Sequence, residues 1–404
     1  MSFQELSQFK YQVKNVLNKM IDLNKCRKDF FISTMSLFLS IKGRINFLQL
    51  ERFGTSDEQS FRNQFEKSFD FLKLNKELVL EHGGGHYTIA FDPSYISKSG
   101  KSTAGVGWFW SGCAGKAKWG LEICGIGIID INNHTAFHLE AEQTLYDSKT
   151  QTLLGYYGNV LVSRKEELLS ISKYVVADAY FSKEPFVSTL CLNGFEIVTR
   201  LRDDANLLYK FYGKKKGGRG RPKKHDGKIE YNKLRENYFT LIQTDDNSRI
   251  HQSIVYSKSL KRDVSVVIVY TKRKEKWSHK IYMTTDLAIT ADKILEYYQT
   301  RFQIEFLYRD GKQHTGLNDC QARSQNKLDF HFNMSLTTIN IAKISHWLSI
   351  PKEKRKSFSM ADIKTRYHNE LLMNRIFVMF GIKPNNAKNK KKIRELLDYG
   401  LIAA

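Results

Sequence analysis

The chain has 404 residues, which is enough for two or three domains and at least one sizeable hydrophobic core. Its 64 lysines and arginines outnumber its 42 aspartates and glutamates, for a formal net charge of +22. Such a positive field favours a polyanionic partner, and nucleic acid more than a membrane surface, because no basic amphipathic anchor adjoins an apolar span.

The five cysteines are scattered, odd in number and without metal-ligand or redox spacing (Cys26, Cys113, Cys124, Cys191 and Cys320). Free thiols in a reducing cytosol fit this pattern best. The first residues, MSFQELSQFKYQVKNVL, lack the apolar core of a signal peptide, and no apolar run is long enough to span a bilayer. We therefore expect a cytoplasmic protein with no membrane partner.

Residues 1–82 are expected to be helical. Phe9–Ile41 has apolar residues at helical spacing and no proline. Arg44–Phe53 suits one further helix that stops at Gly54, and Thr55 with Glu58 forms a capping-box start for the next. Two short helices around a glycine turn fit either a DNA-binding helix-turn-helix or an ordinary helical hairpin. The HGGGH segment that follows fits a flexible linker better than a metal site.

Residues 83–200 are expected to form an α/β core. YTIAFDPSYI, GVGWFWSGC and WGLEICGIGIID have the β-branched and aromatic content of strands. A helix-compatible stretch at 149–169 follows, and YVVADAYF then fits a buried strand. Strands followed by alternating strand and helix predict a mixed sheet with flanking helices.

Residues 201–286 interrupt this alternation. They contain the basic stretch GKKKGGRGRPKKHDGK and then the strand-like runs YFTLIQ, IHQSIVYS, VSVVIVYT and KIYMTTD, which predict a β-rich insertion carrying a basic loop. Helices are expected again over 287–348, followed by a basic helical region at 349–404 that could serve dimerisation.

Two aspartates follow apolar strand-like runs. Asp92 follows Tyr87–Phe91, and Asp178 follows Tyr174–Ala177. Phosphoryl transfer with two metal ions needs hard oxygen ligands that converge from different elements. Each aspartate alone also fits a turn or a helix cap, and Asp130 and Asp286 are rivals on the same reasoning.

Glu305 has more local support. In EYYQTRFQIEFLYRDGKQHTGL, the residues Tyr298, Arg301, Glu305 and Lys312 are spaced 0, 3, 7 and 14. At about 100° per residue they fall within a wedge of roughly 60° on one helix. A surface ladder of arginine–glutamate pairs is the alternative explanation.

The pattern Tyr-x2-Arg-x3-Glu-x6-Lys resembles the signature of the insertion-sequence-4 family, bacterial cut-and-paste transposases with an Asp-Asp-Glu site on a ribonuclease-H-like fold. The family's order, with its first aspartate on the first core strand, its second after a later strand and a β-rich insertion before the glutamate helix, is matched by Asp92, Asp178 and Glu305. The resemblance covers about residues 86–345, and the helices of 1–82 suit the family's DNA-end-binding domain.

The resemblance implies roles for these residues. Asp92, Asp178 and Glu305 would hold two Mg²⁺ ions, which Mn²⁺ could replace, for cleavage at transposon ends and transfer of the 3′-hydroxyl into target DNA. Arg301 and Lys312 would hold phosphates near the cut, and Tyr298 would contact a phosphate or pack at the transposon end. Relatives also stack an extruded base on a tryptophan of the insertion, for which Trp277 is the candidate; a strand-end aromatic covering a core edge is its alternative.

Further basic residues are candidates for DNA contact. Arg219-Gly220-Arg221-Pro222 resembles an AT-hook, which lies in an A·T-rich minor groove, while a disordered basic linker binding phosphates is equally compatible with it. The neighbouring Lys223 and Lys224 would bind phosphates, as would Lys98 and Lys101 behind Asp92 unless they are ordinary loop lysines.

The sequence thus predicts a DNA transposase that binds double-stranded DNA, namely the terminal inverted repeats and the target, as a homodimer associated with the bacterial nucleoid. A metal-dependent nuclease of the same fold that never joins strands, and a non-enzymatic DNA-binding derivative, are the alternatives. The three acids, the insertion and the helix signature favour the transposase.

Overall fold

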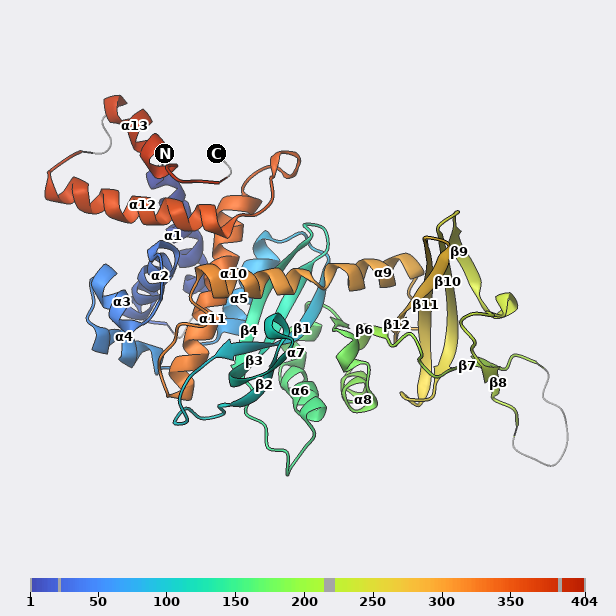
Figure 1. Cartoon of the computed structure of the whole chain (residues 1–404). Helices are drawn as coiled ribbons and strands as arrows, with labels where there is room; N and C mark the ends of the chain where they lie inside the picture. Colours follow the sequence, from blue (N-terminus) through green and yellow to red (C-terminus); the bar gives the residue numbers. More distant parts are fainter. Residues whose placement is uncertain (1, 21–22, 214–221, 384–386, 403–404) are drawn as a thin grey trace.

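The computed structural model describes residues 2–20, 23–213, 222–383 and 387–402 (Figure 1). Five helices come first: α1 (Ser2–Lys19), α2 (Lys25–Ser40), α3 (Phe47–Phe53), α4 (Glu58–Phe65) and α5 (Phe71–His82). The expected stop at Gly54 is confirmed, since its amide donates to the Leu50 carbonyl oxygen at 2.8 Å. The expected capping box is wrong: the side chain of Asp57, rather than that of Thr55, accepts the Ser60 amide and starts α4.

The N-terminal helices share their core with the later helix α11 (Gln325–Ala342). The Phe330 ring lies 5.5 Å from Phe31, 4.5 Å from Phe65 and 5.3 Å from Phe71, measured between centroids. Burying large aromatic side chains in this way is strongly favourable. The first 82 residues are therefore packed onto the core rather than standing apart from it.

The core sheet has the strand order β4–β3–β1–β5–β6. β3 runs antiparallel to both of its neighbours, β4 and β1, whereas β5 runs parallel to β1 and β6 runs parallel to β5. This arrangement is that of a ribonuclease-H-like core, as the sequence predicted. The strands are β1 (Tyr87–Ser97), β3 (Lys116–Asp130), β4 (Thr135–Gln143), β5 (Tyr174–Val176) and β6 (Glu196–Leu201).

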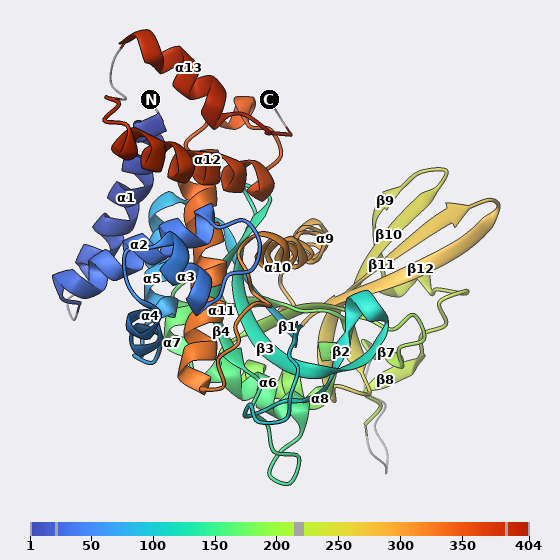
Figure 2. The same cartoon turned by 60° about the vertical axis from the view of Figure 1, so that its left-hand side comes forward.

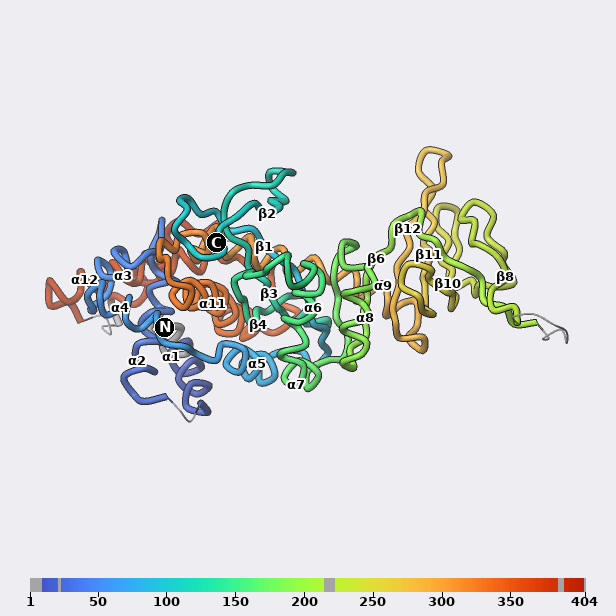
Figure 3. The backbone as a smooth tube through the Cα atoms, turned by 90° about the horizontal axis from the view of Figure 1, so that it is seen from below, coloured from blue at the N-terminus to red at the C-terminus, as the bar shows by residue number. Residues whose placement is uncertain are grey.

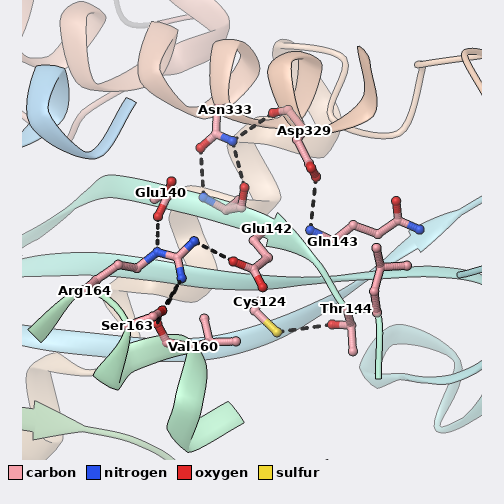
Figure 4. A network of polar contacts seen from close by, with 12 residues as sticks. Cys124, Glu140, Glu142, Gln143, Thr144, Val160, Ser163, Arg164, Asp329 and Asn333 are labelled. Atoms are coloured by element: carbon pink, nitrogen blue, oxygen red, sulfur yellow. Dashed lines mark hydrogen bonds and ion pairs between the residues drawn. The ribbon is translucent and has the colours of Figure 1, made fainter. Parts of the chain in front are cut away.

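Helices cover the core sheet. On one side α11, α5 and α10 (Gln303–His314) contact β4, and on the other α6 (Leu153–Val162) contacts β3. Arg164, between α6 and α7 (Lys165–Leu169), pairs with both Glu140 and Glu142 of β4, as Figure 4 shows. From the opposite side, the Asn333 amide group of α11 exchanges hydrogen bonds with the backbone of Ala141. Each link fixes the position of β4 relative to a helix.

The β-rich insertion is continuous with the core sheet, because β12 (Lys276–Thr284) pairs with β6. From there the order runs β12–β11–β10–β7–β8, with β9 also on β10. Figures 1 and 2 show this part extending away from the helices. Its remaining strands are β7 (Leu207–Lys210), β8 (His225–Lys228), β9 (Thr240–Thr244), β10 (Ser248–Ser257) and β11 (Arg262–Arg273). The four expected strand runs thus all occur, and the basic loop joins β7 to β8.

The remaining elements complete the chain. A crossover through α8 (Glu184–Leu192) links β5 to β6, and α9 (Ala291–Thr300) packs against β6, β11 and β12. After α11 come a π-helical turn (Lys343–Leu348), α12 (Met360–Met379) and α13 (Ala387–Leu397). The five cysteines form no disulfide. Among the helices that the structure describes, none is both long and apolar enough to span a bilayer.

Candidate active site

The register of β1 and β5 brings Asp92 and Asp178 to the same level of the sheet. These strands are parallel neighbours, and their last paired positions are Ala90 and Val176. Each aspartate lies two residues beyond its partnered position. Asp178 comes after β5 has ended, whereas Asp92 lies within β1, which continues through it to Ser97. The expectation that Asp92 ends its strand is therefore wrong, because β1 goes on pairing with β3 after it leaves β5.

Helix α10 is attached to β1 beside Asp92. The Tyr308 hydroxyl donates to the Asp92 carbonyl oxygen at 2.8 Å, and Lys312 Nζ donates to Ser94 Oγ at 2.9 Å. The four residues from Tyr308 to Lys312 advance about 6 Å along the helix. The two residues from Asp92 to Ser94 advance about 6.6 Å along the strand. Helix and strand therefore run side by side in the same direction, and Glu305, one turn before Tyr308, is carried to the level of Asp92.

A glycine makes this attachment possible. Gly125 on β3 is the direct cross-strand partner of Asp92. A Cβ atom at position 125 would overlap the hydroxyl of Tyr308. The hydroxyl reaches the backbone of β1 only because residue 125 has no side chain.

The signature residues do not share one uninterrupted helix as expected. Tyr298 is on α9, which ends at Thr300, and α10 begins only at Gln303. Arg301 lies at the junction, where its guanidinium donates to Glu305 Oε1 at 2.9 Å and lies 5.9 Å from the Tyr298 ring centroid. This is the i,i+4 pair of the ladder alternative, but Arg301 is only 14% exposed whereas Glu305 is 56% exposed. A surface ladder would leave both side chains in water.

The charged side chains on these separate elements interact electrostatically. Burial raises the pKa of Asp92 to about 7; Arg301 opposes this rise, Asp178 and Glu305 add to it, and Lys312 opposes it. Burial lowers the pKa of Arg301, but the charge of Asp92, followed by Tyr298 and Glu305, outweighs burial and raises it overall. Mutual shifts of this kind require charges within a few ångströms in a region of low dielectric. We call Asp92, Asp178, Arg301, Glu305 and Lys312 the acid cluster.

The acid cluster offers carboxylates from three separate elements, which is the donor chemistry that Mg²⁺ prefers. Asp178 is oriented by the Tyr180 amide, which donates to its Oδ1 at 2.8 Å. Glu305 is instead turned to Arg301. As the described side chains stand, no three of the His, Cys, Asp and Glu type are close enough to hold a metal ion together. The donor types suit the metal, whereas the described side chains as they stand do not converge on one, and Glu305 is held by Arg301.

The rival aspartates have other partners. Asp130 is fully buried and pairs across the sheet with Tyr87, five residues or about 17 Å along β1 from Asp92. Its carboxylate accepts the Gly84 amide at 2.7 Å and the Asn133 amide at 3.0 Å, which closes the turn after β3.

The Asp286 carboxylate accepts hydrogen bonds from Lys173 Nζ at 2.7 Å and from the Tyr174 hydroxyl at 2.8 Å. Tyr174 begins β5, so Asp286 lies at the opposite end of that strand from Asp178. Neither rival aspartate belongs to the acid cluster.

Tyr298 connects the acid cluster to the insertion. Its ring packs edge-to-face on Tyr282 of β12, with centroids 5.1 Å apart. Burial raises its pKa, Arg301 opposes the rise and Asp178 adds to it, so the phenol is within electrostatic range of the second aspartate. The junction between the core sheet and the insertion therefore lies beside the acid cluster.

The predicted phosphate-binding lysines behind Asp92 behave differently from one another. Lys98 Nζ donates to the carbonyl oxygens of Cys320 at 2.8 Å and Ala322 at 2.7 Å. It therefore holds an internal loop, which is the ordinary loop role the sequence also allowed. Lys101 is exposed.

Trp277 lies in the insertion. It is four residues, or about 13 Å, along β12 from Ile281, where the pairing of that strand with β6 of the core begins. Its ring is 42% exposed, carries Arg249 at 4.9 Å over its face, and lines a cavity of about 370 Å³ with Tyr231, His251, Tyr270 and His279. The alternative of an aromatic covering a core edge does not fit so open a ring.

The basic loop is described only at its end. Arg219 and Arg221 lie outside the described residues. Lys223 pairs with Asp226 and lies 4.9 Å from the Phe211 ring centroid, while Lys224 is exposed.

Sequence reasoning missed Tyr308 and Gly125. Both had a signal: Tyr308 follows Glu305 by three residues and precedes Lys312 by four, which places all three on one face of a helix. Gly125 and Gly127 lie in the apolar part of a strand, and a glycine inside a strand indicates close approach of another group.

Part of the chain resembles known proteins. No curated protein matches the sequence. Among solved structures, the cryo-EM structure of a piggyBac transposase synaptic complex with hairpin DNA matches with 13% identity and a TM-score of 0.37, over 99% of this chain and 84% of that one. The strand order, rather than this overall superposition, carries the fold assignment.

A family model described as "Transposase DDE domain" matches residues 164–341. The matched segment contains Asp178, the whole insertion and Glu305, and it begins after Asp92. From Arg164 to Ile341, the chain is therefore similar to the transposase DDE domain.

Proposed function

We propose that this chain is a DNA transposase of the insertion-sequence-4 type, which cleaves DNA at transposon ends and transfers the freed strand ends into target DNA. The observation that carries the proposal is the acid cluster: β1 and β5 pair in parallel just before Asp92 and Asp178, and Tyr308 attaches the helix of Glu305 to β1 at Asp92. The match of residues 164–341 to the transposase DDE domain supports it.

Asp92, Asp178 and Glu305 would hold two Mg²⁺ ions, or Mn²⁺ in their place. When bound, such ions supply Lewis-acid stabilisation of the attacking and leaving oxygens of a phosphodiester. Glu305 is available for this role once its carboxylate exchanges Arg301 for the metal, and its 56% exposure leaves room for that rotation. We infer that the Arg301–Glu305 pair belongs to the metal-free state.

The chain's own residues position the DNA. Once Arg301 is released from Glu305, its planar guanidinium is suited to binding a phosphate. Lys312 provides a second positive charge in the acid cluster. Tyr308 and Gly125 keep α10 in register with β1, so that a shift of the helix would move Glu305, Arg301 and Lys312 together.

The insertion and the basic loop would extend the DNA contact. Trp277, open and covered by Arg249 on one face, suits stacking of an extruded base, and the loop from β7 to β8 suits a minor groove or a phosphate track. We also propose a homodimer on paired ends. The apolar end of α12 supports a protein contact there, since Val378, Met379 and Phe380 are 83%, 79% and 72% exposed.

The test is an assay with the full chain, Mg²⁺, a duplex carrying the inverted repeats that flank the gene, and a target plasmid. We expect nicking at the repeat end followed by covalent joining to the plasmid. Asp92→Asn should abolish both reactions while leaving DNA binding unchanged. Asp292→Asn, an exposed acid in the first turn of α9, is the matched control and should behave like the wild type.

The outcomes separate the alternatives. Cleavage without any joined product would replace the transposase with a nuclease of the same fold. Binding to the repeats without cleavage in any metal would indicate a non-enzymatic derivative. Sedimentation of the paired-end complex with one protomer would contradict the homodimer.

A further inference from the structure

The hairpin of β2 (Gly107–Ser111) and the first part of β3 carries an open aromatic face. Trp108 and Trp110 are 70% and 65% exposed. They are two residues apart on one strand and so point to the same side. Trp119 is the direct cross-strand partner of Trp108, its ring centroid lies 5.9 Å away, and it is 36% exposed. Three indoles thus share one face that the rest of the described chain leaves uncovered.

The charge around these indoles is of one sign. Residues 97–121 contain four lysines and no aspartate or glutamate. Lys98 is used internally, but Lys101, Lys116 and Lys118 are exposed. Exposed indoles among cations, with no acid between them, match single-stranded nucleic acid, whose bases stack on aromatic rings while its phosphates follow the positive charge. A second copy of this basic hairpin would meet it with charge repulsion.

The hairpin is attached next to the acid cluster. Tyr95, three residues beyond Asp92 on β1, donates from its hydroxyl to the Trp119 carbonyl oxygen at 2.7 Å, and Lys118 lies 6.0 Å from its ring centroid. Figure 3 shows the hairpin standing out from the core beside β1.

We propose that the tryptophan hairpin is a stacking platform for unpaired bases of the DNA strand that enters the acid cluster. The proposal rests on the proposed function and adds a second aromatic contact, separate from Trp277, on the core side of the molecule. A platform here would bind strand-separated or extrahelical bases directly beside the phosphodiester to be cut. Stacking is tolerant of sequence, so the terminal repeat does not need to be known to test it.

The experiment compares two labelled oligonucleotides by fluorescence anisotropy with the full chain: a fork with an unpaired arm, and the fully paired duplex of the same sequence. The double variant Trp108→Ala, Trp110→Ala should bind the fork at least about tenfold more weakly and the duplex within about twofold of the wild type. Trp108→Phe, Trp110→Phe should recover most of the fork affinity. Leu192→Ala, which changes an 84% exposed apolar residue at the end of α8, should bind both probes like the wild type.

Equal loss on fork and duplex, or no loss on either, would overturn the platform. So would a fall in sedimentation mass of the DNA-free alanine variant, since the hairpin would then be a protein interface. The two proposals fail separately. If the wild-type chain prefers the fork through these tryptophans but never cuts terminal repeats, only the transposase proposal is refuted. Wild-type chain that cuts and joins the repeats with no effect of the alanine variant refutes the platform alone.

Discussion

The two halves of the continuous sheet, the core strands and the insertion strands, differ in how far their residues are buried. In the core half, the last eleven residues of β3 are all buried, and helices lie on both sides of β4. In the insertion half, all five residues of β9 are exposed, and β10 is mostly half-buried. The buried half holds the acids in a fixed register, as a catalytic constellation requires, and the open half presents aromatic and basic side chains to a partner.

The comparison predicts that even a small packing change in the core half slows cleavage strongly. Gly125→Ala drives a methyl group into the Tyr308 hydroxyl and displaces α10. Because a misplacement of about 1 Å at a catalytic group can cost roughly 100-fold, we expect a loss of cleavage rate of about that size. Single-turnover kinetics on a pre-nicked end would measure it.

Adding Tyr308→Phe to Gly125→Ala removes the overlapping oxygen and should restore part of the rate. If the double variant is as slow as the product of the two single effects predicts, the two residues are independent and α10 is not positioned through this contact.

A substitution of Arg301 tests whether this residue binds a phosphate or only pairs with Glu305. Arg301→Lys retains the charge and loses the planar fork, so we expect the cleavage rate to fall about tenfold with little change in thermal stability. An unchanged rate would assign Arg301 to the ion pair alone. Gln299, an exposed neighbour on α9, provides a control as Gln299→Lys.

In the insertion half, Trp277→Ala should act on DNA handling rather than on protein stability. The indole is 42% exposed, so its removal costs the fold little, while loss of one stacked base corresponds to about 1–3 kcal/mol. We expect weaker binding of a substrate with an extrahelical base and an unchanged melting temperature. A large drop in melting temperature would show that Trp277 covers a core edge after all.

The last of these predictions is a pH dependence of stability where α12 packs on α2. Lys364 of α12 is buried, donates to the Phe38 carbonyl oxygen at 2.7 Å, and has its pKa lowered from 10.5 to about 7 by burial. The unfolded chain therefore binds the proton more tightly, and stability rises with pH between about 7 and 10.5. Denaturant unfolding of Lys364→Met should show a slope in this window that is shallower by up to about 1.4 kcal/mol per pH unit. The exposed Lys293→Met should leave the slope unchanged.

Local patterns in the sequence sufficed for part of this molecule. The strand runs of the insertion and the return of helices after it follow from residue periodicity, so they were predictable, whereas the choice of Asp92 and Asp178 depended on the family resemblance. The continuation of β1 through Asp92 was not, because it depends on pairing with β3 more than twenty residues later. The internal use of Lys98 is likewise decided by a distant partner, the Cys320 carbonyl.

The most direct test of the acid cluster uses the two aspartates at opposite ends of β5. Single-turnover cleavage should be measured for Asp178→Asn and Asp286→Asn, with DNA binding and circular dichroism measured on both. The cluster predicts a loss of at least about a thousandfold for Asp178→Asn, or roughly 4 kcal/mol of transition-state stabilisation, and a rate within about threefold of wild type for Asp286→Asn. An active Asp178→Asn beside an inactive, folded and DNA-binding Asp286→Asn would contradict the assignment.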